Sequence, residues 1–159
     1  MSYLELLASS AEGSVGMMSQ TLADFSDADL LVRPCAGANH AAWQLSHLCN
    51  AEAHFAPKIG TALVVPAKIV GKGSKQDAAN DDPAYWSASK SELLETLTSL
   101  RKQSADAIRK LTPDDLAKPS DFGMFPTVAH LVVLYTGHIQ MHLGQFQVIP
   151  RKLAKPIMF

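Results

Sequence analysis

Two of the six histidines in this 159-residue chain, His138 and His142, are four residues apart in a segment with helical periodicity. Residues at this spacing lie one turn apart on the same face of an α-helix, so both imidazoles can reach one metal ion. The surrounding segment 122–150 contains no Asp, Glu, Lys or Arg. Two unpaired imidazoles are costly to bury in such surroundings, whereas a shared metal ion satisfies both rings. The pair therefore predicts a metal site.

The third ligand must come from another helix, because a zinc-like site needs three or four ligands and keeps one position open if it is catalytic. His40, His47 and His54 follow one another at seven-residue intervals in a second helical segment. They share one face, but each step separates them by about 10 Å along the helix axis. Only one of the three can join the pair, and spacing does not choose which one.

The remaining histidines have an ordinary interpretation. His130 lies about 12 Å before His138 along the same helix, which is too far to share its ion. A lone histidine on an apolar helix face usually forms a hydrogen bond with a carbonyl group or a water molecule. We expect this role for His40, His54 and His130.

Four helical segments position these residues. They are expected at about Tyr3–Phe25, from Asn39 to just before Pro57, from Ser89 to Leu111, and from about Pro126 to Ile149. Their apolar residues recur every three or four positions. The third segment begins with an S-x-x-E capping box. Since no strand pattern is evident, the sequence predicts an all-α fold, a four-helix bundle formed by a single domain, residues 1–159.

The segment 61–85 is the least regular part of the chain, with a run of Gly, Ser, Asp and Lys that is typical of a surface loop. A loop of this length in a compact domain is often functional, for example as a lid. A tolerated insertion is the alternative interpretation.

The composition restricts the class of protein. Hydrophobic residues make up 47% of the chain, charged residues 18%, and the net charge is -1, as in soluble globular proteins. This balance gives no basic surface for nucleic acid and no polybasic membrane patch. The charge-free segment 122–150 is long enough to span a bilayer, but its three histidines and three glutamines are costly in hydrocarbon. We expect a cytoplasmic protein, because the N-terminus lacks signal-peptide features.

Three motifs resemble those of the DinB-like family of helical metalloproteins. Trp43–Leu48 (WQLSHL) resembles the W-x-x-x-H-L element of its second helix, and Asn39 fits the same element. His138–Gln145 (HIQMHLGQ) resembles its H-x-x-x-H-x-G-Q element. Arg151–Pro156 (RKLAKP) resembles its R-x-L-G-K-P tail, with Ala154 where the family usually has Gly. The motifs follow the family's order and cover most of the chain.

The resemblance implies a four-helix bundle, commonly a homodimer, with a metal held by His47, His138 and His142. Characterised relatives include transferases that use low-molecular-weight thiols. The implied function is thiol S-transfer to small electrophiles. The alternatives are a metal-dependent hydrolase, a non-enzymatic metal or small-molecule binding module, and a structural metal site. Imidazole suits both zinc and nickel. Zinc is our first choice of divalent metal ion because of its availability, and nickel is the second. We expect a small-molecule substrate, with neither nucleic acid nor membrane as partner.

Two further side chains are candidates for catalytic roles. Gln145 lies one turn beyond His142 and could orient a metal-bound group, although packing is an equal alternative. Tyr135 lies one turn before His138 and could donate a proton. Glu52 follows His47 by five residues, which turns it away from the ligand face, so it is not assigned as a general base.

Overall fold

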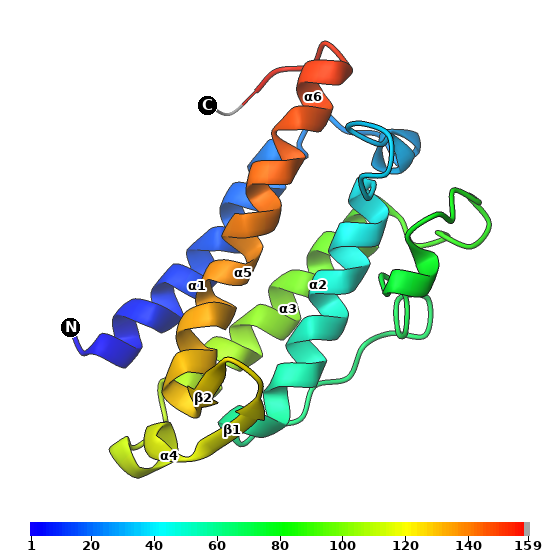
Figure 1. Ribbon diagram of the computed structural model, residues 1–159. Coiled ribbons are helices and arrows are strands. Elements are labelled where there is room, and N and C mark those ends of the chain that lie inside the picture. Colours follow the sequence, from blue (N-terminus) through cyan, green and yellow to red (C-terminus); the bar gives the residue numbers. More distant parts are fainter. Residues whose placement is uncertain (158–159) are drawn as a thin grey trace.

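Four long helices form the body of the structure (Figure 1). The computed structural model describes residues 1–157. The long helices are α1 (Tyr3–Thr21), α2 (Ala41–Phe55), α3 (Lys90–Ile108) and α5 (Val128–Phe146). The short ones are η1 (Ala28–Leu31), η2 (Ala56–Ile59), η3 (Lys75–Asp77), α4 (Pro113–Ala117) and α6 (Val148–Lys152). Helix α1 packs against α3 and α5, and α2 packs against α3. The all-α four-helix bundle is therefore confirmed.

The helix ends follow local capping rules and correct two predicted boundaries. Ser89 and Glu92 form the predicted capping box at the start of α3. Helix α2 is capped by His40 rather than by Asn39, because Nδ1 of His40 accepts a hydrogen bond from the backbone N–H of Trp43 at 3.0 Å. The predicted fourth segment is split into α5 and α6, since Pro150 lies in the first turn of a new helix, where proline is tolerated.

A two-stranded antiparallel hairpin was not expected from the sequence. It pairs β1 (Pro119–Phe122) with β2 (Phe125–Thr127). Strands of this length show too few alternations to be recognised as a pattern. The turn depends on Asp121 and Gly123, which have φ angles of 57° and 47° in the left-handed region. The hairpin lies beside the C-terminal end of α2, where Asp121 Oδ2 is 3.3 Å from Lys58 Nζ (Figure 1).

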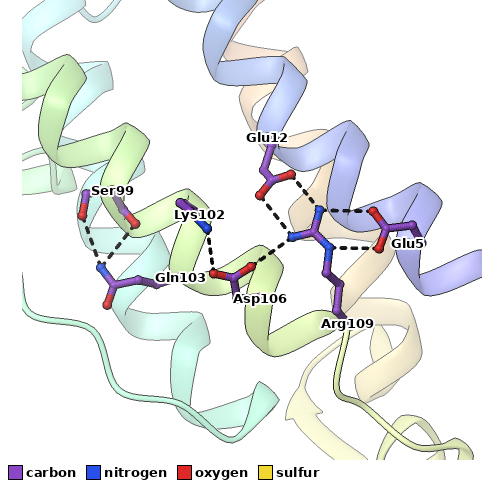
Figure 2. Close-up of polar contacts among 7 residues, drawn as sticks. All are labelled: Glu5, Glu12, Ser99, Lys102, Gln103, Asp106 and Arg109. Carbon is purple, nitrogen blue, oxygen red and sulfur yellow. Dashed lines mark hydrogen bonds and ion pairs between the residues drawn. The ribbon is translucent and has the colours of Figure 1, made fainter.

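An ion-pair network joins α1 to the end of α3 (Figure 2). Arg109 Nε lies 3.0 Å from a carboxylate oxygen of Glu5, and Arg109 Nη2 lies 2.7 Å from one of Glu12. Asp106, paired with Lys102, is also 3.1 Å from Arg109 Nη1. Hydrogen bonds from this guanidinium lower the pKa of both glutamates. The network fixes the register of the two helices without using any of the histidines.

Helix α5 is buried on one side only. Ile139, Leu143 and Phe146 lie in the core, whereas Val133 and Met141 are more than half exposed. No helix within residues 1–157 is both long enough and apolar enough to cross a membrane.

The irregular segment 61–85 is tied to α2 by hydrogen bonds. Asn50 Nδ2 donates to the carbonyl oxygens of Ile69 and Lys72, each at 3.0 Å, and its Oδ1 accepts from the backbone N–H of Gly71 at 3.0 Å. Trp43 Nε1 donates to the carbonyl oxygen of Ser74 at 2.9 Å. The loop is therefore a fixed wall beside α2 rather than a detached insertion.

Candidate metal centre

The side chains of His47, His138 and His142 converge between α2 and α5. One ring nitrogen from each lies within 4.8 Å of the other two, so the three could hold one metal ion. The ring centroid of His47 is 5.3 Å from the centroid of each of the other two rings. The geometry thus selects the same member of the seven-residue series as the family resemblance did.

The other three histidines lie apart from this cluster. His40 is buried at the start of α2, where its second ring nitrogen lies 3.1 Å from the carbonyl oxygen of Asn80. His130 is exposed, and its Nδ1 is 2.7 Å from Thr127 Oγ1. His40 therefore has the expected carbonyl partner, whereas His130 contacts a side-chain hydroxyl instead. His54 is exposed one helical turn before Lys58.

Two of the converging imidazoles are oriented by oxygen atoms that can only accept hydrogen bonds. Nδ1 of His47 is 3.0 Å from the carbonyl oxygen of Gly73, and Nδ1 of His142 is 3.0 Å from Oε1 of Gln44. The hydrogen-bond network therefore assigns the proton to Nδ1 in both rings and leaves each Nε2 with a free lone pair. Ligation of a metal ion through Nε2 requires this tautomer.

The amide of Gln44 has its own fixed orientation. Its Nε2 donates to the carbonyl oxygen of Asn39 at 2.9 Å, which turns Oε1 toward His142. The side chain is fully buried, so rotation of the amide would leave two buried polar groups mispaired. Gln44 belongs to the WQLSHL motif, three residues before His47, but its spacing alone did not indicate this contact.

Gly73 lets the loop approach α2 closely enough to bind His47. A Cβ atom at this position would lie 2.4 Å from the backbone nitrogen of His47 and 2.7 Å from the carbonyl oxygen of Trp43. Its φ of +80° is in the left-handed region, which also favours glycine. The indole of Trp43 stacks on His47 with centroids 5.0 Å apart. The imidazole is thus held between an aromatic face and a backbone carbonyl.

Substituting Gly73 by alanine should weaken metal binding by about 10- to 100-fold, because it displaces the carbonyl that orients His47. The matched control is Gly71→Ala. Gly71 also has a positive φ, +76°, but a Cβ there would meet no atom within 4 Å. Zinc affinity is measured by competition with a chromophoric chelator. Equal losses in the two variants would show that backbone strain, not the contact with His47, is responsible.

All three imidazoles are neutral near pH 7. Burial, together with the neighbouring imidazoles, lowers the pKa of His142 to about 3. Burial also lowers the pKa of His138, to about 4, and that of His47. A metal ion binds the neutral imidazole, not the imidazolium. The three histidines are therefore ready to bind a metal ion without first releasing a proton.

A cavity of about 610 Å³ lies against the histidine cluster, with His47 and His138 in its wall. Its apolar wall is formed by Ala51, Phe55, Phe122, Leu131, Leu134 and Met141. Within residues 1–157, no fourth His, Cys, Asp or Glu joins the three histidines. The donor set fits a divalent ion that keeps a position open for a ligand entering from the cavity.

The two candidate catalytic side chains lie in different places. The ring of Tyr135 lines the cavity, but its hydroxyl is buried and has no hydrogen bond of good geometry within the described residues. Burial, followed by the charge of Glu52, raises its pKa well above the usual range. Gln145 is exposed and does not line the cavity. The structure therefore does not bring Gln145 to the histidines, and Gln44 supplies the amide there instead.

A buried ion pair lies behind the cavity wall. Arg101 Nη1 is 3.0 Å from Glu52 Oε1, and both side chains are at most 2% exposed. Ser104 donates to the other carboxylate oxygen at 2.7 Å. The guanidinium also lies 4.6 Å from the ring centroid of Tyr135. Glu52 thus binds Arg101 rather than the histidine cluster, in agreement with its predicted direction.

The C-terminal tail accommodates its one departure from the family motif. Ala154 has a φ of 52°, in the left-handed region that glycine adopts at no steric cost. The backbone therefore keeps the turn that the usual glycine would favour, and Lys155 Nζ still reaches Asp29 Oδ2 at 2.7 Å.

Comparison with known proteins agrees with this geometry. No curated protein matches the chain. The family model of the DinB superfamily matches residues 12–146, a span that contains α2, α5 and all three converging histidines. Because the match covers most of the sequence, the chain belongs to the DinB superfamily.

Proposed function

We propose that this protein is a metal-dependent transferase that joins a low-molecular-weight thiol to a small electrophile. The observation that carries the proposal is the position of the three histidines in the wall of a largely apolar cavity, with no fourth ligand among residues 1–157. A structural metal usually has four protein ligands, whereas a catalytic one keeps a position open.

The chemistry follows from the donor set. A divalent ion held by neutral imidazoles would lower the pKa of a bound thiol and so supply a thiolate nucleophile. Gly73 and Gln44 hold two of the imidazoles in the ligating tautomer. The apolar cavity wall holds the electrophile beside the sulfur and excludes water. In the transfer, a carbon–sulfur bond forms as the bond to the leaving group breaks. The leaving group takes the electron pair, and the thiol proton passes to solvent.

Zinc is the metal we propose first, with nickel as the alternative. Three imidazole ligands suit either ion, and the donor set alone does not favour one. Elemental analysis of protein purified without a histidine tag and without nickel resin distinguishes the two.

The proposal is tested with a panel of low-molecular-weight thiols against aryl halides and epoxides, with product detected by mass spectrometry. We expect conjugation that is lost on chelation and restored by zinc. Metal-dependent ester hydrolysis without thiol consumption would favour the hydrolase alternative and overturn the proposal. Unfolding on chelation would indicate a structural metal instead.

A further inference from the structure

The cavity follows one face of α2 from the histidine cluster to the end of that helix. Its lining residues from α2 and η2 recur at helical steps: His47, Asn50, Ala51, His54, Phe55 and Lys58. At a rise of 1.5 Å per residue, Lys58 lies about 16 Å from His47 along the helix axis. The cavity is therefore elongated, with the histidines toward one end and Lys58 at the other.

The charged residues of the cavity wall are all basic. Among residues 1–157, no Asp or Glu lines the cavity, whereas Lys58 and Lys72 both do. Lys72 is engaged elsewhere, because its ammonium donates to the carbonyl oxygen of Tyr85 and lies 4.7 Å from the centroid of that ring. Lys58 is paired with Asp121 of the hairpin at 3.3 Å, and that carboxylate is 80% exposed. Such an exposed pair is weak, so Lys58 is available to a ligand.

The space between the two ends is apolar. Phe55, Leu131 and Leu134 form its wall from α2 and α5, and Phe122 of the hairpin contributes a ring. The Phe122 ring centroid is 6.3 Å from that of His54. A hydrocarbon segment of a ligand would be removed from water along this length.

We infer that the ligand of this cavity is an elongated apolar molecule with an anionic end group, which Lys58 binds at the end remote from the histidines. The inference rests on the proposed function, because it names the class of thiol or electrophile that the same site accepts. A cation in an apolar cleft whose wall carries no carboxylate attracts anions and disfavours cations. Asp121 competes with the ligand for Lys58, so removing its charge should strengthen binding of an anion.

The test uses cobalt-substituted protein and three thiols: 11-mercaptoundecanoate, the uncharged 11-mercaptoundecanol, and the short 3-mercaptopropionate. Dissociation constants come from the sulfur-to-cobalt charge-transfer band. We expect the long acid to bind about fivefold more tightly than the alcohol. Lys58→Gln should abolish this preference and Asp121→Asn should increase it. The short acid should be insensitive to Lys58, because it cannot span the cavity.

Lys102→Gln is the matched control, since Lys102 is also exposed and paired, with Asp106, but lies outside the cavity. It should leave the preference unchanged. The inference would be overturned if the long acid and the alcohol bound equally, or if the preference for the acid survived in Lys58→Gln. In either case, thiol binding would still support the proposed function. Calorimetry of the metal-free protein with dodecanoate and dodecanol makes the same comparison. If the metal-free protein prefers the acid, and the preference depends on Lys58, the inference is supported even if no thiol binds.

Discussion

Replacing His138 by alanine should reduce metal affinity by more than about 100-fold while leaving the helical bundle folded. Changes to groups that merely orient metal ligands already cost about 10- to 100-fold, and losing one of three ligands costs more. The His138 ring contacts those of His47 and His142 at centroid distances of 5.3 Å and 4.9 Å. Within residues 1–157 no hydrogen bond joins it to other groups, so truncation leaves no buried partner unsatisfied.

The measurement is zinc affinity by chelator competition, together with the thermal unfolding of the metal-free protein. His130→Ala is the control, because His130 lies on the same helix but is exposed and bonded to Thr127. It should leave zinc affinity unchanged. If His138→Ala bound zinc as tightly as the wild type, the assignment of the metal to this cluster would be contradicted.

Replacing Arg101 by methionine should destabilise the fold by about 3–5 kcal/mol, because it leaves the buried carboxylate of Glu52 without its partner. Glu52 is 1% exposed, and without Arg101 it keeps the hydrogen bond from Ser104 but no positive charge beside it among the described residues. For a chain of this size the melting temperature should fall by roughly 10 °C. Urea unfolding of the metal-free variant and wild type measures the difference.

The destabilisation should depend on pH in a defined direction. Burial raises the pKa of Glu52 above its ordinary value of 4.5, and Arg101 opposes that shift. Without Arg101 the folded state binds a proton at Glu52 more tightly than the unfolded state does. Stability of Arg101→Met should therefore fall as pH rises above about 4.5 and go on falling until the raised pKa is passed.

The double variant Glu52→Gln with Arg101→Met is the control for this explanation. It removes both charges, so most of the lost stability should return, and the added dependence on pH should disappear. A double variant as unstable as Arg101→Met would show that packing of the Arg101 stem, not the unpaired charge, causes the loss.

The sequence predicted the long helices because each carries apolar residues at steps of three or four. It also predicted the pair His138 and His142, because a spacing of four has one geometric meaning within a helix. The third ligand could not be derived from spacing, since His40, His47 and His54 share a face. Only the relative position of α2 and α5 distinguishes these three histidines, and the sequence does not show that position. His47 was therefore chosen from the family resemblance.

The contacts that orient the histidine ligands could not be predicted from the sequence, for a related reason. Gly73 reaches His47 across 26 residues of chain, through a loop whose backbone conformation no periodicity describes. Gln44 is a residue of the helix itself, but its partner His142 is 98 positions away. The hairpin at 119–127 was missed because its strands are too short to show alternation. The contacts of Gly73 and Gln44 are tertiary, whereas the hairpin is local and was missed because of its length.

The stacking of Trp43 on His47 should make the fluorescence of this indole a probe of metal binding at the three histidines. The fluorescence of an indole responds to electron demand in a ring that it faces, and an imidazole bound to a divalent ion is a stronger electron acceptor than a free one. The two centroids are 5.0 Å apart and the planes are within 11° of parallel. Metal binding should therefore change the emission of the unlabelled chain, with Trp86, which contacts His40 instead, as a constant background.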